Sequence, residues 1–175
     1  MPPTHANVRY SDDYKRSTLD LWLPKAGEKP APLVVLFHGG GFKYGNKSKI
    51  PQKKDFLSLL ERGYAVASVG YPLLGDKGAT DGIGPKDYEK IFAQTGLVLT
   101  FLRKHAGDYR LDMNRIVTGG TSAGAMIAEY LAYKRDFGIK ACIGIQQPFA
   151  LEPALGGHWR RRTAALSLLG IPHPR

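Results

Sequence analysis

The chain has 175 residues, of which 43% are hydrophobic and 23% charged, and it carries a formal net charge of +10. This length is typical of one domain, because chains of about this size bury roughly 70% of the surface that they expose when unfolded. No run approaches the ~20 apolar residues of a membrane-spanning helix, and residues 1–10 lack the apolar stretch of a secretory signal. We therefore expect a cytoplasmic globular protein without a membrane span.

The positive charge is concentrated in two places, residues 43–54 and 160–162. No nucleic-acid motif accompanies these residues, and few aromatic side chains are interleaved with them. We interpret them as a solvated basic face and expect no nucleic-acid partner. An anionic substrate or surface is the alternative that the sequence leaves open.

The first half of the chain predicts four strands and a helix. Leucines alternate with Asp20 and Trp22 over residues 18–23, as in a strand with one buried face. The continuous apolar run at 33–37 is typical of a strand that is buried on both faces. Pro51 begins a helix, and Gly63 ends it. The expected strands are 7–10, 18–23, 33–37 and 65–69, and the expected helix is 51–62.

The second half continues the alternation of helices and strands. A glycine-rich loop covers 74–84, and apolar residues at helical spacing then predict a helix over 85–105. A short strand at 116–117, a helix at 122–134 and a strand at 139–145 follow. Cys142, the only cysteine, lies in this last strand, where we expect a small buried hydrophobic residue rather than a reactive thiol. The alternation predicts an α/β fold whose mostly parallel sheet has helices on both faces.

The composition changes near residue 150. Residues 1–150 contain 14 Lys and 7 Arg, whereas 151–175 contain 4 Arg and no Lys. We therefore expect residues 1–150 to be the N-terminal part of a domain and 151–175 to be an atypical tail. A frameshift, a fusion scar, disorder and an ordinary variable terminus are all compatible with that tail.

The strongest chemical signal is Gly120-Thr121-Ser122-Ala123-Gly124, between a predicted strand and a predicted helix. In that context the Gly-x-Ser-x-Gly pattern exposes a serine nucleophile on a sharp turn. Gly120 and Gly124 let the strand and the helix approach each other. Ser122 would stand at the helix N-terminus, where unpaired N–H groups favour negative charge. The alternative is a glycine-rich turn in which Ser122 only caps the helix.

A second signal, His38-Gly39-Gly40-Gly41-Phe42, directly follows the apolar strand at 33–37. Consecutive glycines can turn several backbone N–H groups toward one point. Acyl transfer needs such donors to stabilise the oxygen that becomes negative in the tetrahedral intermediate. A flexible loop or a phosphate-binding turn is the alternative, but no Gly-x-Gly-x-x-Gly or P-loop lysine pattern follows.

These two motifs, about 80 residues apart, resemble the α/β-hydrolases of the hormone-sensitive-lipase-like and feruloyl/acetyl esterase branches. The stretch Leu19-Asp20-Leu21-Trp22-Leu23-Pro24 and the approach to the elbow at 109–117 are similar to the same family. The resemblance covers roughly residues 7–148. It implies a carboxylic-ester hydrolase, an esterase or lipase that acts on a small ester and uses neither metal nor cofactor.

Carried over by position, the resemblance implies a role for each matching residue. Ser122 matches the nucleophile, and the backbone N–H groups of Gly40, Gly41 and Ala123 match the oxyanion hole. His38 matches a histidine that shapes the loop and is not the general base.

The acid and the base of a catalytic triad are not identified by the sequence. In this fold they follow the nucleophile in the order acid, then histidine. Only one strand is expected after Ser122, whereas the family has two more whose loops carry these groups. Glu152, His158 and His173 are weak candidates, and Asp136 is expected at the opposite end of the sheet.

Two hypotheses therefore remain. The chain is a serine ester hydrolase that works through an acyl-enzyme on Ser122, or it is a truncated or non-catalytic relative, such as a binding module or a fragment. If the last strands are missing, strand 139–145 has an exposed edge, which predicts self-association.

Overall fold

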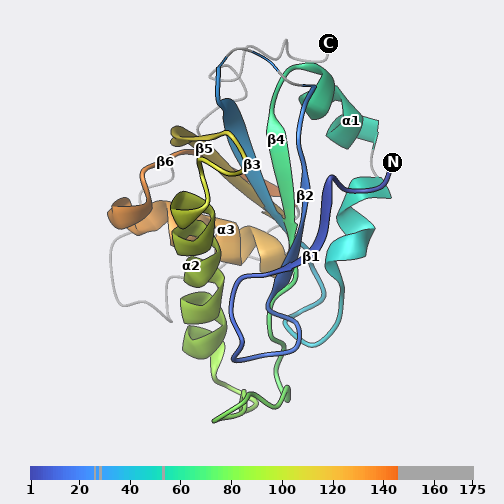
Figure 1. Ribbon diagram of the computed structural model, residues 1–175. Coiled ribbons are helices and arrows are strands. Elements are labelled where there is room, and N and C mark those ends of the chain that lie inside the picture. Colours follow the sequence, from blue (N-terminus) through green and yellow to red (C-terminus); the bar gives the residue numbers. More distant parts are fainter. Residues whose placement is uncertain (26, 28, 53, 146–175) are drawn as a thin grey trace.

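The computed structural model describes residues 1–25, 27, 29–52 and 54–145. Six strands form one sheet in the order β1-β2-β4-β3-β5-β6 (Figure 1). The strands are β1 (His5–Arg9), β2 (Thr18–Trp22), β3 (Ala31–Phe37), β4 (Ala65–Val69), β5 (Leu111–Thr121) and β6 (Ile139–Ile145). The helices are η1 (Lys47–Gln52), α1 (Lys54–Glu61), α2 (Tyr88–Lys104), α3 (Ala123–Tyr133) and η2 (Arg135–Phe137).

The sheet is parallel from β4 to β6. β3 pairs in parallel with β4 on one side and with β5 on the other, and β5 pairs in parallel with β6. β1 and β2 are antiparallel additions at the β4 edge. This arrangement confirms the predicted α/β class with a mostly parallel sheet.

Helices cover both faces of this sheet, as its apolar central strands require. Leu33 and Val35 of β3 belong to the core that also contains the buried residues of α2 and α3. Val34, between them, packs on the other face with Trp22 and with the partly buried Leu59 of α1. Figure 1 shows the same division, with α2 and α3 together on one side and α1 on the other. Alternate side chains of one apolar run thus fill two cores.

Several element bounds differ from the sequence prediction. β4 and β6 have the predicted bounds, whereas β5 begins at Leu111 rather than at 116 because Ala31 and Pro32 of β3 extend the pairing. The predicted helix 51–62 is divided into η1 and α1, and α2 begins three residues later than 85.

The prediction that strand 139–145 is buried is wrong. The residues of β6 are half-buried or exposed, and Ile145 is 48% exposed. Among the strands that the structure describes, β6 pairs with β5 alone, so one edge has no strand beside it. Cys142 is accordingly only partly buried, although its burial still raises the pKa of the thiol to about 11.

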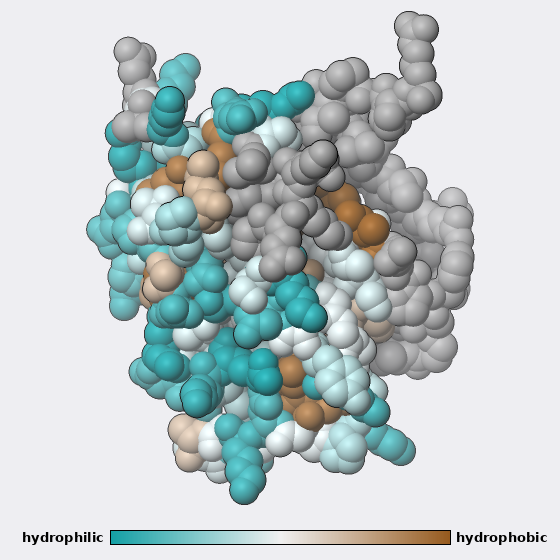
Figure 2. All heavy atoms as spheres, turned by 90° about the vertical axis from the view of Figure 1, so that its right-hand side faces the viewer, coloured by the Kyte–Doolittle hydropathy of each residue, from teal (hydrophilic) through white to brown (hydrophobic). Residues whose placement is uncertain are grey.

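The surface on the β1 side of the molecule is largely hydrophilic where its residues are described, with small scattered hydrophobic patches (Figure 2). No helix of the described residues combines the length and the apolar character that crossing a membrane requires.

Candidate active site

Ser122 occupies a strained turn between β5 and α3. Its backbone has φ 53° and ψ −121°, a conformation that costs a residue with a side chain about 1–3 kcal/mol. Two hydrogen bonds fix the turn: the Ser122 N–H donates to the Ile145 carbonyl at 2.9 Å, and the Ala125 N–H donates to the Ser122 carbonyl at 2.9 Å. The strand–turn–helix context that gives the Gly-x-Ser-x-Gly pattern its meaning is therefore present.

The two glycines of this pattern permit close backbone contacts. A Cβ at Gly120 would lie 2.3 Å from the Gly124 carbonyl oxygen, and a Cβ at Gly124 would lie 2.2 Å from that of Phe37. Each position is thus restricted to glycine by backbone atoms, which cannot move aside as a flexible side chain can. Gly124 in particular brings α3 against the end of β3, where the second motif begins.

The glycine loop that follows β3 reverses its backbone direction with three successive positive φ angles. These are 125° at Gly40, 59° at Gly41 and 62° at Phe42. Phe42 is not a glycine and is held in this conformation by burial. Its ring is 5% exposed and makes edge contacts with Tyr88 and Phe92 at centroid distances of 5.3 and 5.9 Å. The aromatic contact with α2 therefore anchors the far end of the loop.

The loop lies directly against the elbow. A Cβ at Gly39 would lie 3.4 Å from the Cβ of Ser122 and 2.8 Å from the Thr121 carbonyl oxygen. Among the described residues, no acceptor takes a hydrogen bond from the backbone N–H of Gly40, Gly41 or Ala123. The structure thus brings together the two sequence motifs and leaves three unpaired donors in this region.

His38, the first residue of the motif, is buried and contacts both the glycine loop and Tyr71. Burial lowers the pKa of its ring and so favours the neutral form, and Nδ1 donates to the Gly39 carbonyl at 2.8 Å. The ring stacks on Tyr71 at a centroid distance of 4.2 Å, and the Tyr71 hydroxyl donates to the His38 carbonyl at 2.6 Å. Sequence analysis assigns no role to Tyr71; its place two residues beyond the end of β4, the strand beside β3, is the signal that could have pointed to it.

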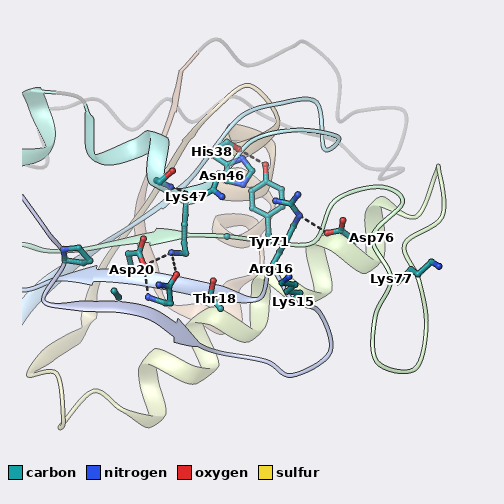
Figure 3. Close-up of a pocket in the computed structure, with 15 residues that line it drawn as sticks. Lys15, Arg16, Thr18, Asp20, His38, Asn46, Lys47, Tyr71, Asp76 and Lys77 are labelled. Atoms are coloured by element: carbon teal, nitrogen blue, oxygen red, sulfur yellow. Dashed lines mark hydrogen bonds and ion pairs between the residues drawn. The ribbon is translucent and has the colours of Figure 1, made fainter.

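His38 also lines a cavity of about 850 Å³ (Figure 3). Its wall combines His38 and Tyr71 with polar and charged residues from β2, from η1 and from the segments around them. Figure 3 shows Lys47 directed toward Asp20, and Arg16 toward Asp76. Ser122 is not among the described residues that line this cavity.

No histidine among the described residues forms a hydrogen bond with Ser122 Oγ. His105 and Asp108 do form a pair, with 2.9 Å between Nδ1 and Oδ2. This pair precedes β5, whereas Ser122 follows it, and an 11-residue strand is about 35 Å long. The pair is therefore too distant to act on Ser122.

The other candidate acids and bases are placed as follows. Asp136 lies in η2, before β6, and so at the sheet end opposite the elbow, as expected. Glu152, His158 and His173 lie outside the described residues. Within the described part of the chain, no group of three or more His, Cys, Asp and Glu residues is placed to hold a metal ion.

Comparison with known proteins shows that this chain is similar to esterases. The sequence model of the BD-FAE family matches residues 19–142. Tuliposide A-converting enzyme 2 of Tulipa gesneriana is 28% identical over 145 residues, which are 75% of this chain and 35% of that protein. The probable isoprenylcysteine alpha-carbonyl methylesterase ICMEL1 of Arabidopsis thaliana is 33% identical over 73% of this chain and 24% of its own length.

Solved structures agree with the sequence comparison. A bifunctional GH43-CE protein of Bacteroides eggerthii superposes with a TM-score of 0.58 at 28% identity, over 70% of this chain and 15% of that one. The chain thus spans about a third of the length of the tulip relative, and less of the other two.

Proposed function

The chain belongs to the BD-FAE family of α/β-hydrolase esterases, and we propose that it is, or is part of, a serine carboxylic-ester hydrolase with Ser122 as its nucleophile. The observation that carries the proposal is the strained backbone of Ser122 at the carboxyl end of β5, directly against the glycine loop. A strained residue between well-packed elements is characteristic of a functional site. Small or short-chain esters are the proposed substrates.

The reaction proceeds through an acyl-enzyme. Ser122 Oγ attacks the carbonyl carbon of the ester while a base takes the hydroxyl proton, and the carbonyl oxygen becomes an oxyanion. The N–H groups of Gly40, Gly41 and Ala123 donate to that oxyanion, and the N-terminus of α3 adds a favourable dipole. The tetrahedral intermediate then expels the alcohol, which takes the proton. Water attacks the acyl group in the same way and releases the acid.

The proposed base and its orienting acid lie outside the described residues. Glu152, His158 and His173 are the candidates within the chain, and a histidine is the group that this chemistry most often uses. Without a base, an oxyanion hole alone still accelerates hydrolysis by about 10³-fold over water. Weak activity is therefore not sufficient evidence for a complete site.

The test compares hydrolysis of p-nitrophenyl acetate and butyrate by the chain and by its Ser122→Ala variant. Ser58→Ala, an exposed serine of α1, is the matched control. We expect saturable turnover that falls to background in Ser122→Ala and is unchanged in Ser58→Ala. A phosphonate ester that labels serine nucleophiles should add one adduct to the parent chain and none to Ser122→Ala, by intact mass. Equal rates and equal labelling in the two chains would contradict the proposal and favour a non-catalytic relative.

A further inference from the structure

Lys47 makes a nearly buried ion pair that the catalytic proposal does not use. Its ammonium lies 2.5 Å from Asp20 Oδ1 and donates to Asn7 Oδ1 at 2.8 Å. The Lys47 and Asp20 side chains are each only 11% exposed. The same Asp20 oxygen also accepts the Asn7 backbone N–H at 2.7 Å. Lys47, which follows the glycine loop, is thus joined to both antiparallel strands: to β1 through Asn7 and to β2 through Asp20 (Figure 3).

The backbone of Lys47 is fixed as well. Its carbonyl accepts a hydrogen bond of 2.6 Å from the hydroxyl of Ser68, a fully buried residue of β4. The aliphatic part of the side chain runs beside the end of β4, where a Cβ at Gly70 would lie 3.6 Å from Lys47 Cδ. Lys47 is therefore attached to β2 through its charge and to β4 through its carbonyl.

Two residues before Lys47, the chain presses on the glycine loop. A Cβ at Gly45 would lie 2.4 Å from the Gly39 carbonyl oxygen and 2.4 Å from His38 Nδ1. The Lys43 and Tyr44 N–H groups both donate to the Gly40 carbonyl at 3.0 Å. The segment between the loop and Lys47 thus touches three of the four residues from 38 to 41.

We propose that Lys47, paired with Asp20, is a positioning residue that holds the glycine loop in register with Ser122. The proposal rests on the function assigned above, because the loop then supplies oxyanion donors. A charged anchor suits this task because Asp20 is the one described carboxylate with which Lys47 pairs, whereas an apolar contact would tolerate sliding. A buried ion pair adds little net stability but fixes one arrangement of its two partners.

The test uses variants that separate positioning from folding. Lys47→Met keeps the length of the side chain and removes the charge, but it leaves Asp20 buried without a cation, which is strongly destabilising. The double variant Asp20→Asn with Lys47→Met removes both charges and avoids that penalty. Lys47→Arg restores a cation and is the rescue. Lys49→Met, at an exposed lysine two residues further on, is the matched control.

The first readout is amide hydrogen exchange, which does not depend on catalysis. In the double variant, exchange of the Lys43 and Tyr44 amides should rise by about 10-fold or more, because these amides report the Gly40 turn. The Ala125 amide, which donates to Ser122 in the elbow, should keep its rate. A rise at all three positions would mean general loss of stability, and no rise at Lys43 and Tyr44 would mean that the pair does not hold the loop. Either result overturns the proposal.

The second readout is ester hydrolysis, applied where Ser122-dependent turnover is found. Misplaced oxyanion donors should lower kcat by about 10- to 100-fold and leave KM within about twofold, because the donors act on the transition state. Lys47→Arg should recover most of kcat, and Lys49→Met should match the parent. An unchanged kcat in the double variant overturns the proposal. Absence of Ser122-dependent turnover in the parent chain contradicts the catalytic function itself, and the exchange experiment then decides the role of Lys47 in the loop.

Discussion

Gly124 shows how a residue without a side chain permits the close backbone contact on which the candidate site depends. Its Cα faces the carbonyl groups at the end of β3 and at the start of the glycine loop, so that the first turn of α3 contacts both. Phe37 and His38 supply both carbonyl oxygens, at 2.2 and 2.5 Å from the position that a Cβ would take. These are backbone atoms, which cannot move aside as the end of a flexible side chain can.

We therefore predict that Gly124→Ala lowers the free energy of unfolding by about 3 kcal/mol, the upper part of the range for overpacked sites. Gly107→Ala is the control, because a Cβ at Gly107 meets no atom within 4 Å. That change should stay within about 0.5 kcal/mol. Urea unfolding followed by far-UV circular dichroism measures both. Similar stability for Gly124→Ala and the parent chain would show that α3 can move away from β3.

The residues of the site differ in how far the sequence could predict them. Ser122 and the three glycines lie in contiguous motifs whose backbone needs are local, so their arrangement follows from a few neighbours. Lys47, Asp20 and Asn7 meet only because β1 and β2 lie beside β4, and no local pattern records that meeting. Tyr71, in turn, meets His38 because β4 lies beside β3.

At the scale of elements, α3 is attached to β5 by a buried side chain. The Thr118 hydroxyl, fully buried in β5, donates to the Ala128 carbonyl of α3 at 3.0 Å. The carbonyl lies in the second turn of the helix that begins beside Ser122. This bond therefore fixes the position of α3 relative to β5.

Replacing this hydroxyl should loosen the helix slightly. Thr118→Val is expected to lower the free energy of unfolding by about 1 kcal/mol, the usual contribution of one such hydrogen bond. The same replacement at Thr100, exposed on α2, should change it by less than about 0.5 kcal/mol. Thermal unfolding of the two variants beside the parent provides the comparison. Equal effects of the two variants would mean that the Thr118 bond contributes nothing measurable.

Element bounds were predictable where the apolar pattern and the pairing coincide. Residues 65–69 and 139–145 are mostly apolar, with Ser68 and Lys140 as the polar exceptions, and both strands begin and end as the sequence predicts. β5 is different, because its first part, Leu111–Arg115, carries charged residues and still belongs to the strand. Polar residues join a strand there because β3 supplies partners for them, which a single segment cannot reveal.

At the scale of the whole molecule, the β6 edge is the feature from which we predict behaviour in solution. Among the described strands it has one neighbour, and Ile145 at its end is 48% exposed. Strand edges with unpaired backbone groups and apolar side chains attract further strands. Self-association through this edge therefore stays a prediction.

We expect the 175-residue chain to associate with increasing concentration in sedimentation velocity experiments. Ile145→Lys should shift the equilibrium toward the monomer by placing a charge at the edge. Leu97→Lys, at an exposed leucine of α2, should leave it unchanged. A single monomeric species at every concentration would contradict this expectation.

The single cysteine of the chain lies in β6, so its rate of alkylation reports on the opening of this strand. Burial raises the pKa of the Cys142 thiol to about 11, so the thiolate, which is the form that alkylating reagents attack, is scarce at pH 7. Separation of β6 from β5 would return the sulfur to water and to the acidity of an ordinary thiol. The speed at which Cys142 is modified therefore measures how often the margin of the sheet opens.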